Sequence, residues 1–278
     1  MTIGLFTFLL FLGSIAAGFI GSLTGLGGGL VLVPLLTVAF GVDLKYAIGV
    51  ALISVIATSS GAASAYVKEG FSNVRIGMFL EVATTIGAIC GVTIGLWLNA
   101  KIISCIFGVV LIYSAYSSNK RQTPDHGAVT SDYLATKLRM NGSFPTPTGE
   151  KHYQVTNVPG GFILMWIAGV LSGMLGIGSG AVKVLAMDQV MRIPYKASTT
   201  TSNFMIGVTA AASAGIYLHA GYIVPGLALP VVLGALIGSM TGAKILYGMN
   251  TQKLRLLFTI VILFMGVQMV YHSLQGAL

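Results

Sequence analysis

The chain has 278 residues, of which 55% are hydrophobic and only 8% are charged, and its mean hydropathy is +0.89. This composition leaves too little polar surface to cover a soluble globule, so it excludes that class and indicates an integral membrane protein. The formal net charge of +8 therefore bears on membrane orientation, and we expect no nucleic-acid partner.

Eight apolar runs follow one another along the chain. At 1.5 Å per residue most of them reach the roughly 30 Å of a hydrocarbon core. The sequence therefore predicts an all-α polytopic membrane protein embedded in a lipid bilayer. The runs are residues 3 to 23, 44 to 67, 74 to 97, 102 to 118, 160 to 176, 194 to 218, 222 to 246 and 254 to 274.

The first run leads to a glycine cluster, Gly25 to Gly29, and a second cluster, Gly176 to Gly180, follows 151 positions later. Duplicated apolar halves, each broken by glycines at the same place, are typical of secondary transporters that bind their substrate between the repeats. We therefore predict a first repeat at 1–118, a linker at 119–159 and a second repeat at 160–278. The same offset pairs Tyr66 with Tyr217, Gly70 with Gly221, Gly87 with Gly238, Gly91 with Gly242 and Asn99 with Asn250.

A short apolar segment follows each cluster, at about 28 to 41 and 179 to 191. Its length gives about 21 Å of helix, which is less than a full crossing. We expect each cluster to form the tip of a broken hairpin within the membrane. Each repeat then has about five segments, eight long helices and two short half-helices in all, and the odd number inverts the second repeat relative to the first.

With this inverted topology, 12 of the 15 Lys and Arg residues fall on one face, and Lys45 and Lys101 lie on the other. The positive-inside rule makes the crowded face cytoplasmic, so we predict a cell-membrane protein with both termini outside. The linker is the one polar region and is also predicted to be cytoplasmic. Asn141-Gly142 is a turn signal, and residues 152 to 156 resemble a strand, so the linker is either a small β-hairpin or a plain loop.

The glycine clusters are candidate anion-binding sites. Each opens a helix inside the membrane, where free backbone N–H groups are costly unless a ligand accepts their hydrogen bonds. Two inverted helix N-termini would present positive dipole ends to one oxyanion. The alternative is that the glycines only allow close packing or a hinge. The candidate donors are the N–H groups of Gly27, Gly28, Gly29, Gly178, Ser179 and Gly180.

Lys183 lies within an apolar run three residues after the second cluster, where the first repeat has Leu32. An ionisable residue at membrane depth is a functional candidate by default, and an ammonium group here would attract an anion. Two alternatives stay open: an ion pair with Asp188, or snorkelling toward the cytoplasm.

A polar run from Ser198 to Asn203 opens the next long segment, and Thr201, Ser202 and Asn203 are candidate substrate ligands. Serine and threonine in membrane helices also bond backbone carbonyls, which is the alternative. Glu81 is the one acidic residue within a long apolar run. It is a candidate for carrying a coupling proton, and the alternatives are that it neutralises a Lys or Arg, or lies near the cytoplasmic interface beside Arg75.

Enzyme and metal chemistry find little support in the sequence. Cys90 and Cys105 fall in apolar runs, where we expect core packing, and His219 and His272 have no partner at metal-ligand spacing. We expect no metal, no cofactor and no enzymatic activity. Glycines spaced by four, as in Gly234-Gly238-Gly242, indicate close helix crossings within the chain or in a homodimer.

On these residues the chain resembles the TauE/SafE family of sulfite exporters over almost its whole length. The resemblance rests on Gly25 to Gly29, on Gly173 to Lys183 and on Ser198 to Ala210. It implies export or uptake of small anions such as sulfite, sulfoacetate or related organosulfonates, with proton coupling as one option. Ser179 departs from the pattern of the first cluster, where Gly28 stands, and its hydroxyl would add a ligand or narrow the site.

We predict a secondary transporter that binds a small sulfur-containing anion between inverted repeats and alternates access by rocking one half against the other. Two alternatives remain at this point. An anion channel could use the same donors, and a non-transporting membrane scaffold or sensor could work through the linker.

Overall fold

A computed structural model describes residues 3–24, 27–68, 72–119, 132–146, 149–245 and 251–275. Gly25, Gly70, Asn250 and the linker residues 120 to 131 lie outside these ranges. The described chain is dominated by helices, and five of them are long and apolar enough to cross a membrane, namely α1, α3, α4, α7 and α10. The predicted all-α membrane class is therefore confirmed.

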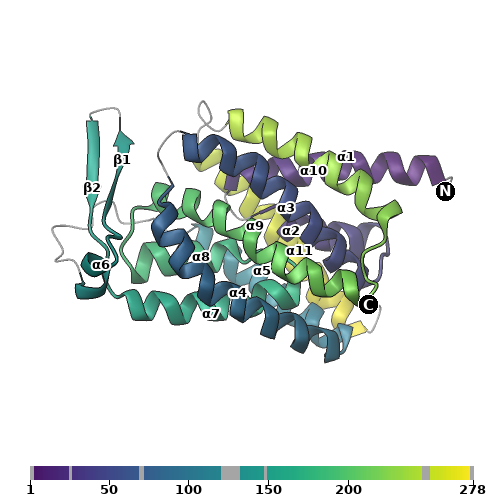
Figure 1. Ribbon diagram of the computed structural model, residues 1–278. Coiled ribbons are helices and arrows are strands. Elements are labelled where there is room, and N and C mark those ends of the chain that lie inside the picture. The colour runs from purple at the N-terminus through teal and green to yellow at the C-terminus, as the bar shows by residue number, and fades with distance from the viewer. Residues whose placement is uncertain are drawn as a thin grey trace.

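Each predicted apolar run overlaps one long helix (Figure 1). The first half contains α1 (Ile3–Thr24), α2 (Gly29–Pro34), a π-helical turn η1 (Leu35–Ala39), α3 (Leu44–Lys68), α4 (Val74–Trp97) and α5 (Ala100–Asn119). The second half contains α7 (Val158–Leu175), α8 (Gly180–Leu185), the π turn η2 (Ala186–Val190), α9 (Tyr195–His219), α10 (Pro225–Ile245) and α11 (Thr251–Gln275).

The offset of 151 residues extends to the element boundaries. The pairs α2 and α8, η1 and η2, and α3 and α9 each begin and end 151 positions apart. A π turn is rare and often lies at a functional site. Its recurrence at equivalent positions in both halves therefore marks the region after each short helix as a candidate for function. Proline is not the common cause, because Pro34 in front of η1 has Leu185 as its counterpart.

The packing of the helices has the symmetry of the two halves: where two helices pack on each other, their counterparts also do. Helix α1 packs on α10 as α7 packs on α4, α3 packs on α10 as α9 packs on α4, and the counterparts α3 and α9, and α5 and α11, pack on each other. Glycines allow the closest crossings, since a Cβ at Gly91 would overlap the carbonyl of Val170, and one at Gly238 would overlap that of Ile15. These glycines are therefore used for packing within the chain.

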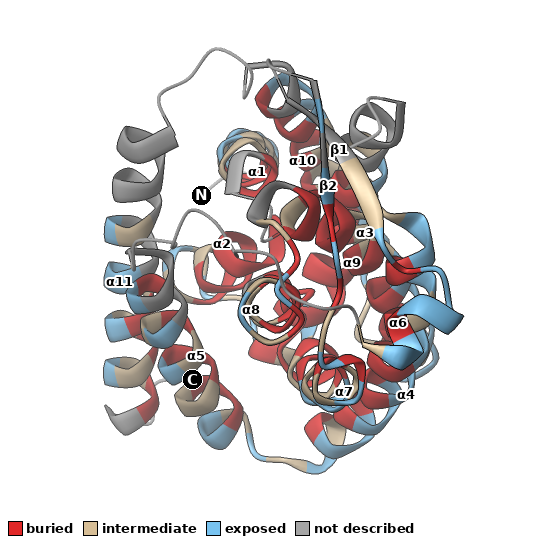
Figure 2. Ribbon diagram, turned by 90° about the vertical axis from the view of Figure 1, so that its left-hand side faces the viewer, coloured by how far each residue is buried: buried red, intermediate tan, exposed pale blue. Residues whose placement is uncertain are grey.

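The two short helices lie in the middle of the molecule, surrounded by the long ones (Figure 2). Residues of α2 are fully buried, whereas large apolar side chains such as Met78 and Leu229 are exposed on the outside, as expected where helices face lipid. Cys90 also lies on this exposed outer surface, so its predicted place in the core is wrong.

The linker contains α6 (Tyr133–Lys137) and an antiparallel β-hairpin of β1 (Gly142–Thr146) and β2 (Gly149–Tyr153), with Gly142 opposite Tyr153. Asn141 precedes β1 and Gly142 is its first residue, so the prediction that this pair forms a hairpin turn is wrong. In Figure 1 the hairpin lies at the opposite end of the molecule from both chain ends.

The hairpin is attached to the start of α4 through Asn73. The Asn73 carboxamide oxygen accepts a hydrogen bond from the N–H of Ile76 and so caps α4. Its amide nitrogen donates to the Met140 carbonyl at 3.0 Å and to the Tyr153 hydroxyl at 2.9 Å. The linker is therefore docked on the membrane helices by specific bonds.

Candidate functional site

The two glycine clusters meet in the centre of the molecule. A Cβ at Gly29 would lie 2.6 Å from the carbonyl oxygen of Gly176, which is closer than a side chain allows. Gly27 and Gly178 both face the side chain of Ile206 on α9. Val55 on α3, the counterpart of Ile206, contacts Gly29 and Gly178 from the other half. Only glycine fits between backbones this close.

The backbone of the two clusters is similar but not identical. Gly27 and Gly178 both have positive φ angles, of 80° and 68°. Ser179 follows in the left-handed region, with φ of 46°, whereas its counterpart Gly28 has φ of −63°. A non-glycine residue in the left-handed region is uncommon and strained. The Ser179 hydroxyl is buried and makes no hydrogen bond within the described chain.

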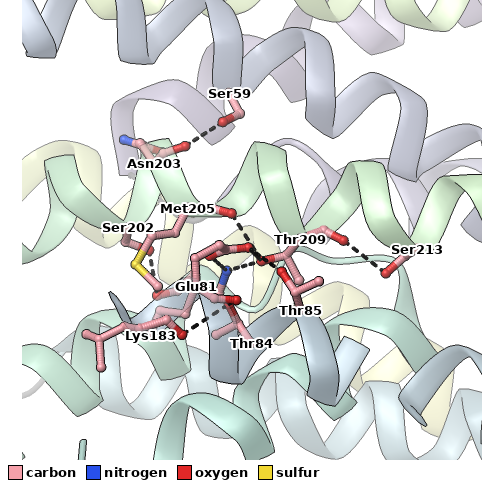
Figure 3. A network of polar contacts seen from close by, with 12 residues as sticks. Ser59, Glu81, Thr84, Thr85, Lys183, Ser202, Asn203, Met205, Thr209 and Ser213 are labelled. Atoms are coloured by element: carbon pink, nitrogen blue, oxygen red, sulfur yellow. Dashed lines mark hydrogen bonds and ion pairs between the residues drawn. The ribbon is translucent and has the colours of Figure 1, made fainter. Parts of the chain in front are cut away.

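Lys183 is fully buried in the first turns of α8 and has its partners on two other helices. Its ammonium group donates to the Thr209 hydroxyl of α9 at 2.5 Å and lies 3.6 Å from Glu81 Oε2 of α4. Thr209 in turn donates to Glu81 Oε1 at 2.5 Å, so the three side chains form one network (Figure 3). The ion-pair partner of Lys183 is therefore Glu81, not Asp188, and the buried ammonium does not snorkel.

Glu81 is 6% exposed and does not pair with Arg75, whose guanidinium group donates instead to the Arg139 carbonyl at 3.5 Å. Its Oε1 atom also accepts a bond from the Thr85 hydroxyl at 3.4 Å. Its Oε2 atom is buried without a hydrogen bond and has only the ion-pair contact with Lys183. One oxygen of the carboxylate is thus held, and the other is open to a proton or a donor.

The three candidates in the polar run of α9 point to different places. Ser202 donates to the Gly180 carbonyl at 3.5 Å and so faces the second glycine cluster. Thr201 accepts a bond from the Asn73 N–H at 3.0 Å and is turned toward the start of α4. The Asn203 carbonyl accepts a bond from Ser59, while its side-chain nitrogen is buried without a hydrogen-bond partner.

The structure thus brings Lys183 into contact with Glu81 of α4 and Thr209 of α9, and it brings Ser202 of α9 to the second glycine cluster. Thr201 lies outside this group. Thr209 was not among the predicted residues. Its signal was a polar stripe, because Ser202, Thr209 and Ser213 are spaced by seven and four residues, which places them on one helix face. All three side chains are buried.

Comparison with known proteins agrees with the membrane architecture. A family model described as sulfite exporter TauE/SafE matches residues 10–269. The chain is 28% identical over 276 residues to the probable membrane transporter protein YunE of Bacillus subtilis, covering 97% of this chain and 98% of that protein. It is 25% identical over 277 residues to the probable membrane transporter protein MJ0441 of Methanocaldococcus jannaschii, covering 94% of each. No solved structure matches.

Proposed function

Because the chain belongs to the sulfite exporter TauE/SafE family, we propose that it is a secondary transporter that moves a small sulfur-containing anion, such as sulfite, sulfoacetate or a related organosulfonate, across the cell membrane. Its relatives are named as probable membrane transporter proteins. The observation that supports an anionic substrate most directly is the buried ammonium group of Lys183 beside a glycine cluster in the centre of the helices.

The proposed site is built on α8 and α9. Lys183 supplies positive charge, and Ser179 stands four residues earlier, where the bond from the Lys183 N–H to the Ser179 carbonyl closes a helical turn. The hydroxyl of Ser179 and the side-chain nitrogen of Asn203 are buried without hydrogen bonds, so a bound oxyanion would satisfy them. Ser202 and the backbone N–H groups at Gly27 to Gly29 and Gly178 to Gly180 complete the set of donors.

We propose that the two halves are inverted repeats that alternate access by rocking against each other. Support comes from the direction of counterpart helices. Tyr46, at the start of α3, packs its ring 5.3 Å from that of Tyr222, which follows the end of α9. At the other end, Thr201 near the start of α9 bonds Asn73, which follows α3. Helix α3 thus runs antiparallel to its counterpart, as an inverted repeat requires.

The charges and the place of the hairpin support one orientation in the membrane. Because the hairpin and both chain ends lie at opposite ends of the molecule, a cytoplasmic linker places both termini outside. The positive-inside rule selects this orientation, since the linker and three other connections hold 12 of the 15 Lys and Arg residues.

Flux of labelled sulfite in proteoliposomes tests the proposal, with sulfoacetate, sulfate and chloride as competitors. We expect saturable flux that shows counterflow, whereas a channel would give flux without counterflow. Lys183→Met removes the charge at similar length and should abolish sulfite flux. Leu32→Met, at the counterpart position, changes one apolar side chain for another and should not. Absence of flux of all these anions above protein-free liposomes would overturn the proposal and favour a scaffold or sensor.

A further inference from the structure

We propose that Glu81 is an internal counter-ion, which pairs with Lys183 while the site is empty. When the transported anion binds, it replaces Glu81 as the partner of Lys183, and Glu81 takes up one proton. This inference rests on the proposed function, because it requires an anion to bind at Lys183. It assigns to the site a fixed coupling of one proton to one monovalent anion.

The argument begins with the net charge of the buried network. Lys183 is fully buried and Glu81 almost so, and in the empty site their charges cancel. A monovalent anion bound to Lys183 would leave one uncompensated negative charge in a region of low dielectric, which is costly. A proton on Glu81 restores neutrality. The empty and the loaded site are then both neutral when the halves rearrange.

The carboxylate is arranged to accept this proton. Oε1 is held by the hydroxyl groups of Thr209 and Thr85, whereas Oε2 makes no hydrogen bond and faces only the ammonium group at 3.6 Å. When an anion draws Lys183 away, Oε2 loses its one stabilising contact. The proton then binds at Oε2 and the negative charge of Glu81 disappears, while the bonds that Oε1 accepts from Thr209 and Thr85 can stay in place.

Thr209 allows the exchange because its hydroxyl has a second acceptor. The Thr209 hydroxyl donates its single proton to Glu81 Oε1 at 2.5 Å. The Met205 carbonyl oxygen lies 3.1 Å from the Thr209 hydroxyl oxygen and could accept the same proton. After Glu81 becomes neutral, the Thr209 proton can turn to Met205. The hydroxyl thus has an acceptor for its proton in both states.

Few other charged groups face Glu81. Helix α7, which packs on α4, contains no charged residue, and the described contacts of α9 with Glu81 come from the neutral Thr209. On α4 itself, Arg75 is exposed and bonded to Arg139. Asp188 of η2, five residues after Lys183, is only partly buried. Lys183 is therefore the charge that decides the protonation of Glu81.

Two consequences follow for the substrate. Among the proposed substrates the site should favour monovalent anions, such as hydrogen sulfite and monosulfonates without a carboxylate, over dianions such as sulfate and sulfoacetate, whose second charge would remain uncompensated. Apparent affinity for a monovalent anion should rise by about tenfold per unit fall in pH over the range in which Glu81 takes up its proton on binding.

The test compares net uptake with counterflow of labelled sulfite in proteoliposomes at mildly acidic pH, where the monoanion predominates. In the wild type, an inward proton gradient should drive net uptake, and a membrane potential imposed with potassium and valinomycin should have no effect. Glu81→Gln keeps an acceptor for Thr209 but cannot gain a proton. Its counterflow should persist, while net uptake should lose its response to the proton gradient and should respond to the potential.

Thr84→Val is the matched control, since Thr84 is buried one turn from Glu81 and its hydroxyl bonds carbonyls of its own helix. It should keep the wild-type responses. Net uptake that follows the potential in the wild type would overturn the inference without use of any variant, and so would a Glu81→Gln protein that is still driven by protons. In both cases sulfite flux would leave the proposed function standing, whereas a wild type without flux would remove both.

Discussion

The two halves of the molecule share a backbone plan but not a chemistry. Helices α2 and α8 begin at positions 151 apart, and each ends in a π turn. In the second half this short helix holds Lys183, which pairs with Glu81 of the first half. The counterpart of Lys183 is Leu32, and the counterpart of Glu81 is Val232, so no such pair exists at the related position. The two similar halves therefore provide the frame, and each contributes one member of the charged pair, Glu81 from the first half and Lys183 from the second.

The counterpart threonines make the contrast sharper because the residue type is the same. Thr58 of α3 donates to the Val55 carbonyl within its own helix, and its methyl group faces Gly28. Thr209 of α9 bridges Lys183 and Glu81. Both halves thus have a hydroxyl at this position, and its role depends on whether a charged pair faces it.

The linker is also attached to the side of the molecule that carries the charged pair. Met140 and Tyr153 of the linker form one apolar cluster with Ile76 of α4 and with Met187 and Met191 of the second half. This cluster adjoins the helices that hold Lys183 and Glu81. Both polar chemistry and the linker are therefore concentrated on the α4, α8 and α9 side.

Replacing one member of the charged pair by its apolar counterpart should have the largest effect on stability. Glu81→Val introduces the residue type found at the counterpart position and leaves the Lys183 ammonium buried without its counter-ion. We expect a loss of about 3–5 kcal/mol in the free energy of unfolding. The double variant Glu81→Val with Lys183→Leu should recover most of this loss but should not transport sulfite.

Denaturant unfolding in detergent, followed by circular dichroism, measures both variants. A single variant as stable as the wild type would contradict the ion pair. A double variant no more stable than the single one would show that the cost comes from packing rather than from the unpaired charge.

The contact between the glycine clusters gives the next largest effect. In Gly29→Ala the new methyl group would meet the Gly176 carbonyl, so one backbone must move, and we expect a loss of about 1–3 kcal/mol. Gly215→Ala in α9 is the control, because nothing lies within 4 Å of its added Cβ. Thermal unfolding of both variants in the same detergent tests the difference. Equal stability would mean that the clusters do not meet as described.

Sequence patterns located the helices and the short segments because these depend on local periodicity and on glycine. They also singled out Lys183, since a lone charge in an apolar run is visible without a structure. They did not pair it with Glu81, because that contact requires α4 and α8 to be brought together by α9. For the same reason they did not predict Thr209, because its role comes from its contacts with Lys183 and Glu81, which are both distant in sequence.

Local chemistry also misled in two places. Asn141-Gly142 is a strong hairpin-turn signal, yet it lies at the start of β1, because the docking of Met140 on Asn73 fixes where the strand begins. Cys90 lies in an apolar run but faces outward, because in a membrane protein an apolar residue is as suitable for lipid as for the core.

Ser179→Gly gives the second cluster the residue that the first cluster has at Gly28. It should change the free energy of unfolding and the affinity for sulfite in opposite directions. Glycine relieves the left-handed backbone of Ser179, so stability should rise by about 1 kcal/mol or less. If the hydroxyl is a ligand, the KM for sulfite should rise at the same time. The reverse exchange, Gly28→Ser, should not change backbone strain, because φ at Gly28 is −63°. A more stable Ser179→Gly protein with unchanged KM would remove Ser179 from the site.

Tyr153→Phe tests the attachment of the linker to α4, the helix that carries Glu81, and should have the smallest effect. It removes the bond from Asn73, whose amide nitrogen keeps the Met140 carbonyl as acceptor, so we expect a loss of about 1 kcal/mol. Tyr133→Phe on α6 is the control, because Tyr133 is 75% exposed and its change should be neutral.

The pH dependence of this small effect identifies its source. Burial raises the pKa of Tyr153 above its ordinary value, against a smaller lowering by the bond from Asn73. A raised pKa in the folded state means that the neutral hydroxyl stabilises fully below the ordinary value of about 10 and loses this contribution as the pH rises further. The difference between wild type and Tyr153→Phe should therefore be constant through neutral pH and should shrink only in alkali. A difference that changes between mildly acidic and neutral pH would have to come from another group, and the Asn73 contact would not be what ties the linker to α4.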